Sequence, residues 1–217
     1  SPSGTYYDPV DIAPYLTKGS NTIAILLWHF GKDGFSHINS GKAALLFEAI
    51  APGLEIVSDA SWQCALYEAY QNTEAPFPNY RMPESNIRFD ARQAITNWNR
   101  TSFEGFLPGA VCVGKAGKAP FGDLVERPIP QWKNSGLLSY VSVRESLKGD
   151  TLFCRLPYNA QITPYLKVEA EAGKTIHIRM DNYEGGSERN VRAEYITREG
   201  EQEYESYGWM NGHEVYY

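Results

Sequence analysis

Cysteine is scarce in this sequence, and long apolar runs are missing. The three cysteines are Cys64, Cys112 and Cys154, and none lies in a CxxC or Cys/His pattern typical of a zinc site. An odd number of widely spaced cysteines does not make a disulfide scaffold, so we expect three small buried side chains; one disulfide with one free thiol is the alternative. No run of about 18 apolar residues occurs, so the sequence predicts no membrane span.

Basic residues are fewer than acidic residues in this chain. The chain carries 20 Lys and Arg residues against 26 Asp and Glu residues, a net charge of −6, and the basic residues form no stripe. Because phosphate neutralisation supplies much of the affinity for nucleic acids, we expect no nucleic-acid partner. Hydrophobic residues make up 42% of the chain, which is enough for a globular core and argues against disorder.

Aromatic residues, in contrast, are abundant at 13% of the chain. Aromatic side chains are enriched in β-sheets, where we expect most of them to pack in the core and in cross-strand pairs. A ring face can also stack on the C–H face of a sugar, so exposed aromatic residues are candidates for carbohydrate binding.

Short β-branched and apolar segments between turn residues predict an all-β fold. A single helical turn is expected at residues 11–16, with Pro14 early in it. The uninterrupted apolar run at 22–28 indicates a buried strand. Further strands are expected at 43–50, 54–59, 60–66, 87–92 and 109–116.

The last third of the chain has the clearest strand pattern. Segments beginning near residues 139, 151, 164, 174, 191 and 201 follow one another at the spacing typical of a β-sandwich. In the segment KTIHIRM, Ile176, Ile178 and Met180 are predicted to share one face. Thr175, His177 and Arg179 would share the other, which makes His177 a solvent-facing residue rather than a ligand.

The loop at 29–42, together with Trp28, is the best binding candidate. It contains three glycines and is long for a hairpin turn, and long ordered loops at strand ends are often functional. One stacking ring beside polar tips suits a sugar, whereas packing of the loop on a neighbouring domain is the alternative. The candidate residues are Trp28, His29, Asp33, His37 and Asn39.

Three segments of the chain resemble one known family. VDIAPYLTKGSNTIAILL, SDASWQC and IRFDAR are similar to the galactose-binding-like β-sandwich in the N-terminal part of bacterial α-L-rhamnosidases, glycoside hydrolase family 78. The matching positions are Asp11, Leu16, Gly19, Asn21, Asp59, Ser61, Trp62, Asp90, Ala91 and Arg92. The acid expected shortly before Asp90 departs from the pattern, since Glu84 lies six residues away. TPYLKVEAEAGKTIHIRMDNY resembles the second β-sandwich of these enzymes.

The resemblance implies a domain plan and a function. Residues 1–92 would form a galactose-binding-like or jelly-roll sandwich whose first strands precede residue 1. Residues 93–134 would form an irregular connection. Residues 135–217 would form a second sandwich that leads into a catalytic (α/α)6 barrel. The chain would be a non-catalytic, extracellular or periplasmic part of a bacterial enzyme that hydrolyses terminal α-L-rhamnosyl residues. It would support the barrel and contact a rhamnose-containing glycan. An independent carbohydrate-binding module and a purely structural spacer are the alternatives.

The residues themselves carry no catalytic motif. GxSxG and HExxH are missing, and no carboxylate here matches the family's catalytic pair, so we expect this chain to be inactive by itself. The alternating acids at 199–205 are interpreted as a solvated strand face. No cofactor is expected; a structural Ca²⁺ held by Asp33, Asp59 and Asp90 is the alternative, although their spacing does not demand it.

Overall fold

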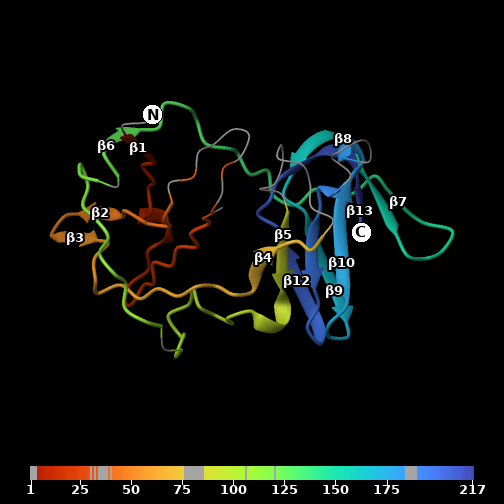
Figure 1. Cartoon of the computed structure of the whole chain (residues 1–217), viewed down its shortest axis with the longest axis horizontal. Coiled ribbons are helices and arrows are strands. Elements are labelled where there is room, and N and C mark those ends of the chain that lie inside the picture. Colours follow the sequence, from red (N-terminus) through yellow and green to blue (C-terminus); the bar gives the residue numbers. More distant parts are fainter. Residues whose placement is uncertain are drawn as a thin grey trace. The chain divides into compact units, whose positions relative to one another are not determined.

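The computed structural model describes all residues except 1–3, 30, 32, 34–38, 40, 76–85, 106, 120 and 184–189. The chain divides into two compact units that interleave along the sequence: unit 1 comprises residues 1–29, 42–66 and 96–134, and unit 2 comprises 30–41, 67–95 and 135–217. Figure 1 shows the strands of both units. The predicted all-β class is confirmed, because the helical segments within the described residues are single 3₁₀ turns.

Unit 2 is a β-sandwich. Its larger sheet has seven strands in the order β4-β5-β11-β10-β13-β8-β7, and its second sheet pairs β12 with β9. All neighbours are antiparallel except β5 and β11, which are parallel. The strands are β4 (Tyr70–Asn72), β5 (Ile87–Asp90), β7 (Ser142–Glu145), β8 (Leu152–Ile162), β9 (Tyr165–Ala170), β10 (Thr175–Met180), β11 (Ala193–Ile196), β12 (Gly200–Glu205) and β13 (Met210–Tyr216).

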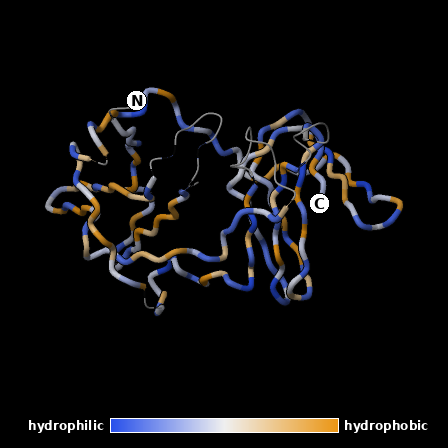
Figure 2. The backbone as a smooth tube through the Cα atoms, viewed as in Figure 1, coloured by the Kyte–Doolittle hydropathy of each residue, from blue (hydrophilic) through white to orange (hydrophobic). Residues whose placement is uncertain are grey.

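The core of unit 2 lies between these two sheets. The alternation predicted for β10 is confirmed, since Ile178 and Met180 are fully buried while His177 and Arg179 are exposed. The same alternation of hydrophobic and hydrophilic residues can be followed along the long strands in Figure 2. Aromatic rings from three strands stack in this core: the ring centroid of Tyr204 lies 4.9 Å from that of Phe89 and 4.8 Å from that of Tyr195.

A β-bulge interrupts the pairing of β13 with β8 between Gly212 and Glu214. The carboxylate of Asp181, in the 3₁₀ turn η4 (Asp181–Tyr183), accepts hydrogen bonds from the backbone N–H groups of His213 (2.8 Å) and Glu214 (3.1 Å). A Cβ atom at Gly212 would lie 2.2 Å from Asp181 Oδ1, so glycine is needed here to let the carboxylate approach the bulge.

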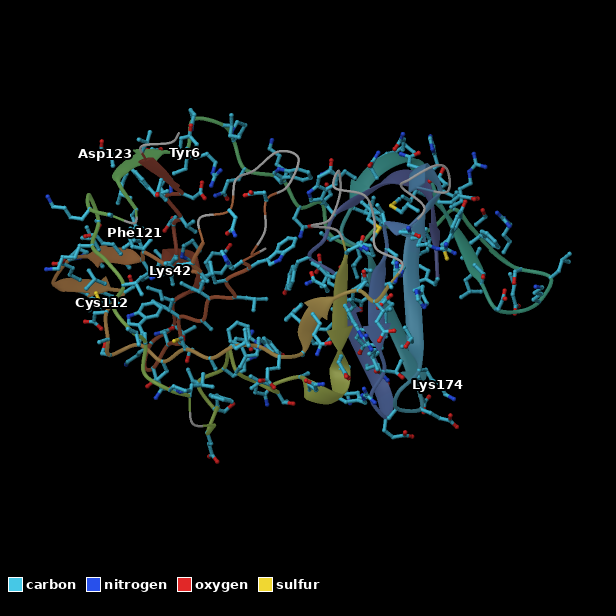
Figure 3. The ribbon with its side chains drawn as sticks, in the orientation of Figure 1. Tyr6, Lys42, Cys112, Phe121, Asp123 and Lys174 are labelled. Atoms are coloured by element: carbon cyan, nitrogen blue, oxygen red, sulfur yellow. The ribbon has the colours of Figure 1, made fainter. Side chains whose placement is uncertain are left out.

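The described residues of unit 1 form two small two-stranded sheets. Strand β1 (Gly4–Tyr7) runs parallel to β6 (Asp123–Glu126), and β2 (Glu48–Ala51) forms an antiparallel hairpin with β3 (Leu54–Val57). Tyr6 and Asp123, labelled in Figure 3, lie on the first of these sheets. Arg127 follows β6 and forms a bidentate ion pair with Asp8, at 2.6 and 3.1 Å. The predicted turn at 11–16 is confirmed as η1 (Ala13–Tyr15).

Several strands predicted for unit 1 are wrong. No strand forms at 22–28, 60–66 or 109–116. Within the last two segments, a single isolated β-bridge pairs Gln63 with Gly109. The run at 22–28 is not buried either: Ile25, Leu26, Leu27 and Trp28 are all exposed. Apolar residues favour a strand only where a neighbouring strand supplies backbone partners, and no described residue forms a backbone hydrogen bond with this run.

The three cysteines do not behave alike. Cys154 on β8 is buried as predicted, and burial raises the pKa of its thiol. Cys64 and Cys112 are exposed, contrary to prediction, and all three are free.

The two units also differ from the linear domain plan expected from the sequence. Residues 67–92 were expected in the first sandwich, and the structure assigns them to unit 2. The physical reason is strand pairing: β5 hydrogen-bonds to β11 through Arg88–Glu194 and Phe89–Tyr195. Residues 96–134, inside the expected connection, belong to unit 1.

Candidate functional site

The five residues predicted to bind carbohydrate are divided between the units. Trp28 and His29 belong to unit 1, and Asp33 and Asn39 belong to unit 2. His37 lies outside the described residues. Trp28 is about half exposed, at 49%, so its ring is available to solvent. The structure therefore places these residues individually, and their joint role in a sugar site stays a prediction.

Asp33 and Asn39 are linked by local hydrogen bonds. The backbone N–H of Asn39 donates to Asp33 Oδ1 at 2.7 Å, and the N–H of Gly41 donates to Asn39 Oδ1 at 2.9 Å. Both side chains thus accept from the loop's own backbone, which is the usual role of Asp and Asn in turns. Their remaining lone pairs are still able to accept hydrogen bonds from ligand hydroxyls.

A row of polar residues crosses one face of the large sheet in unit 2. Cross-strand neighbours place Arg88 on β5 opposite Glu194 on β11, and Glu194 opposite His177 on β10. The alternate residues Phe89, Tyr195 and Ile176 form a matching row that points into the core. One face of these strands is therefore aromatic and apolar, and the other carries charge.

The centre of this polar row is buried. The side chains of Glu194 and Arg192 are 3% and 7% exposed, and Arg192 donates to Glu194 Oε1 from Nε (2.8 Å) and Nη2 (2.7 Å). Arg192 also bonds the backbone oxygens of Glu74 (2.6 Å) and Asn190 (3.2 Å). The amide of Asn86 accepts from Arg192 N–H at 3.1 Å. Such a paired, hydrogen-bonded arrangement is what allows charges to remain buried.

His177 is the titratable group at the exposed end of the row. Its Nδ1 lies 3.8 Å from Glu194 Oε1, and its side chain is about half exposed. Burial lowers the pKa of His177; the charge of Glu194 opposes this effect, while the charges of Arg192 and Arg179 reinforce it. The imidazole can therefore exchange a proton with solvent or donate a hydrogen bond to a ligand, while both Glu194 oxygens are already occupied.

The sequence offered only part of this arrangement. The prediction that His177 lies on the solvent-facing side is confirmed, but its partner Glu194 and the buried Arg192 were not singled out. The available signal was the alternation in NVRAEYI, where Arg192 and Glu194 alternate with apolar Ala193 and Tyr195. Alternation shows which residues share a face of the strand, but it does not show that the polar face is buried. The residues that bury this face are distant in sequence.

The acidic segment at 199–205 lies on a solvated strand face, as predicted. Glu201 pairs with Lys167 (2.6 Å), Glu203 accepts from the Tyr165 hydroxyl (2.8 Å), and Glu205 accepts from the Thr163 hydroxyl (2.6 Å). These neighbours reduce repulsion along the strand. They form a charged surface rather than a cleft with two opposed carboxylates.

Each of the three carboxylates considered as calcium ligands accepts hydrogen bonds from a different neighbouring residue. Asp33 accepts from Asn39 N–H, Asp59 from the backbone and hydroxyl of Ser61, and Asp90 from the guanidinium of Arg92. Across the described part of the chain, no three His, Cys, Asp or Glu side chains gather as a metal site would require.

Comparison with known proteins gives no relative. No family model matches the chain, and neither a curated protein nor a solved structure matches it. Within the described residues, no helix is long and apolar enough to cross a membrane.

Proposed function

We propose that this chain is a non-catalytic accessory region of an α-L-rhamnosidase-like glycoside hydrolase. The parent enzyme would hydrolyse terminal α-L-rhamnosyl residues in an extracellular or periplasmic setting. In this proposal the chain supports a catalytic barrel, and residues 1–92 correspond to the galactose-binding-like region of the family. The chain contacts a rhamnose-containing glycan through exposed aromatic and polar side chains.

The observation that carries the proposal is the structural role of the family-like positions. Asn21 closes a turn, because its amide oxygen accepts from Thr17 N–H (2.9 Å) and its amide nitrogen donates to Thr17 O (2.9 Å) and Gly19 O (3.0 Å). Asp90 ends β5 and accepts from the Arg92 backbone (3.1 Å) and guanidinium (2.9 and 2.7 Å). These residues build turns, so the resemblance concerns scaffold positions.

The second family-like segment has the same character. Asp59 Oδ1 accepts from Ser61 N–H at 2.8 Å and from the Ser61 hydroxyl at 2.5 Å, which lowers the pKa of Asp59. Trp62 donates from Nε1 to Val57 O at 2.9 Å and packs on Phe47 with ring centroids 5.3 Å apart. A segment that fixes its own turn and anchors one indole suits a supporting region better than a catalytic one.

Two measurements on the purified chain test this function. A rhamnoside assay with an aryl α-L-rhamnoside should show no release above the blank. Calorimetric titration with L-rhamnose and with rhamnose-capped oligosaccharides should give saturable heat, whereas D-rhamnose, the mirror-image sugar, should not. Hydrolysis that follows the chain through purification would overturn the non-catalytic role. Flat titrations in a folded sample would overturn the carbohydrate contact.

One observation favours a second candidate, a purely structural spacer between domains. Unit 1 exposes large apolar side chains, among them Trp132 at 72% and Val111 at 80%. Apolar groups exposed in this number are typical of surfaces covered by another domain. A spacer predicts strong binding of a hydrophobic dye and no heat with any sugar.

A further inference from the structure

Four side chains form a row across the outer face of the large sheet in unit 2. Strand pairing places Arg144 on β7 opposite Phe153 on β8. Tyr216 on β13 lies opposite Phe153, and Arg179 on β10 lies opposite Tyr216. The guanidinium of Arg144 lies 3.7 Å from the centroid of the Phe153 ring, and the rings of Phe153 and Tyr216 meet edge to face at 4.9 Å. The row faces away from the core, because the neighbouring Cys154 points into it.

Two arginines on this face have no carboxylate partner. Arg155 and Arg179 are exposed, and neither forms a hydrogen bond or an ion pair with any described residue. Arg155 is paired across the ladder with Glu214, but the Glu214 carboxylate accepts from Arg144 at 3.3 Å instead. Because a guanidinium stays charged at any ordinary pH, the surface keeps an excess of positive charge.

We call this surface the arginine face. It consists of Arg144, Arg155, Arg179, Phe153 and Tyr216.

The opposite surface of the same sandwich carries negative charge. On β12 the side chains of Glu201, Glu203 and Glu205 point outward, and the residues between them are buried. Lys167 on β9 pairs with Glu201 at 2.6 Å. Glu203 and Glu205 accept hydrogen bonds from hydroxyl groups, which leave their negative charge uncompensated. We call these three glutamates the acidic strip.

The spacing of the arginine face matches that of the acidic strip. Arg144 and Arg179 are three strands apart in the sheet, about 14 Å at the usual distance of about 4.8 Å between neighbouring strands. Glu201 and Glu205 are four residues apart on one strand, about 13 Å at about 3.3 Å per residue. Sheets also pack with their strands nearly perpendicular. In that orientation, three glutamates can lie opposite three arginines.

We propose that the arginine face binds the acidic strip of a second copy of this chain. Glu203 pairs with Arg155 and Glu205 with Arg179, so the groups without an opposite charge in one copy find one in the next. Arginine and aromatic residues are also enriched in protein interfaces. The contact joins two different surfaces of the sandwich, so association is head-to-tail and open-ended. This inference goes beyond the proposed function and requires no saccharide.

Sedimentation equilibrium of the purified chain tests the contact. Since exposed ion pairs contribute little each, we expect weak association, with a Kd of about 0.1–1 mM at low ionic strength. The average mass should rise with protein concentration and pass twice the mass of one chain. It should return to that of one chain in about 1 M NaCl, because salt screens exposed charges. A single chain at every concentration would overturn the inference. So would association that persists in high salt, which would point to the exposed apolar groups of unit 1.

Charge reversal identifies the two surfaces. Arg155→Glu combined with Arg179→Glu should lower the association constant at least about tenfold, because like charges then face each other. Glu203→Lys combined with Glu205→Lys should do the same. An equimolar mixture of these two variants should associate again, since the reversed arginine face of one complements the reversed acidic strip of the other. Recovery in the mixture also shows that both variants are folded.

Arg100 and Lys118 supply the matched control, because both are exposed basic residues of unit 1. Arg100→Glu combined with Lys118→Glu reverses two charges and should associate within about twofold of the wild type, since the contact is local. If this control loses association as much as the arginine-face variant does, net charge is the cause and the inference is overturned. If the two reversed variants are folded by circular dichroism and their mixture stays monomeric, the surfaces do not meet. Neither result affects the proposed function, which the rhamnoside and sugar titrations test separately.

Discussion

Unit 2 buries Ile178, Met180 and Val215 completely, whereas no described residue of unit 1 is fully buried. The difference does not come from a shortage of apolar residues in unit 1, which contains the longest apolar run of its sequence at 22–28. It comes from strand pairing. In the described part of unit 2, nine strands supply one another's backbone partners and present alternate apolar faces to a shared core.

Unit 1 shows what remains when that pairing is limited. The four strands among its described residues form two separate pairs, and the run at 22–28 joins neither. Two-stranded sheets are marginally stable in water by themselves. The comparison teaches that apolar content sets the capacity to form a core, while register and neighbouring strands decide whether a core forms.

Hydrogen exchange should show the largest difference between the units. We expect the amides of β10, which is paired on both sides by β11 and β13, to exchange at least about 1,000-fold more slowly than those of 22–28. The hairpin of β2 and β3 should fall between them. Equal protection of β10 and 22–28 would break the comparison, because the run would then be paired in solution.

Truncation of one isoleucine in each unit should give the next largest contrast. Ile178 is 0% exposed, and Ile178→Ala should lower the free energy of unfolding by about 2–5 kcal/mol through lost burial and the cavity left behind. Ile50 on β2 is 77% exposed, and Ile50→Ala should change it by no more than about 0.5 kcal/mol. Urea denaturation measures both. A comparable loss in the two variants would show that unit 1 has a core of its own.

The sequence predicted unit 2 well because its strands carry their own pattern. In β10 apolar and polar residues alternate strictly, and in β12 every second residue is a glutamate, so the faces follow from period-two geometry. The parallel pairing of β5 with β11 could not be predicted, because Phe89 and Tyr195 are 106 residues apart and no sequence pattern indicates that they pair. The strand predicted at 22–28 in unit 1 was wrong for a related reason. The segment TIAILLW has the composition of a strand, but a strand forms only where a second strand supplies backbone hydrogen-bond partners.

The candidate site was predictable only residue by residue. Trp28, Asp33 and Asn39 have the exposure or hydrogen bonding expected of loop residues, but sequence spacing could not show that they belong to different units. The buried Glu194–Arg192 pair was missed because burial of a polar face depends on distant cover.

Replacing one glycine by alanine in each unit compares how the two units tolerate one added methyl group. Gly212→Ala places a Cβ atom 2.2 Å from Asp181 Oδ1 and 3.3 Å from Met180 Cβ, so either the Asp181 carboxylate leaves its two backbone N–H partners or the bulge shifts. We expect a loss of about 1–3 kcal/mol in the free energy of unfolding. Gly109→Ala in unit 1 is the control, because its nearest neighbour would be Ala60 O at 3.8 Å, an ordinary contact. A smaller loss for Gly212→Ala than for Gly109→Ala would contradict the close approach of Asp181.

The smallest expected effect is the pH response of His177. Burial lowers its pKa below the ordinary value of 6.5, so the unfolded chain takes up the proton first as the pH falls. Above 6.5 the histidine is neutral in both states and has no effect on the pH slope. As the pH drops from 6.5 towards the lower folded pKa, stability is lost, and below that pKa the loss is complete. Because the imidazole is about half exposed, solvent screening keeps the change small.

His177→Gln isolates this contribution. The variant should match the wild type in thermal stability at pH 8 and should lose less stability than the wild type as the pH falls below 6.5. Glu194, Glu74, Arg192 and Arg179 are the charges that act on the imidazole, and all of them belong to unit 2. The altered slope should therefore appear in the unfolding of unit 2 and not in unit 1. An NMR titration that places the pKa of His177 above 6.5 would reverse the sign, because attraction to Glu194 would then outweigh burial.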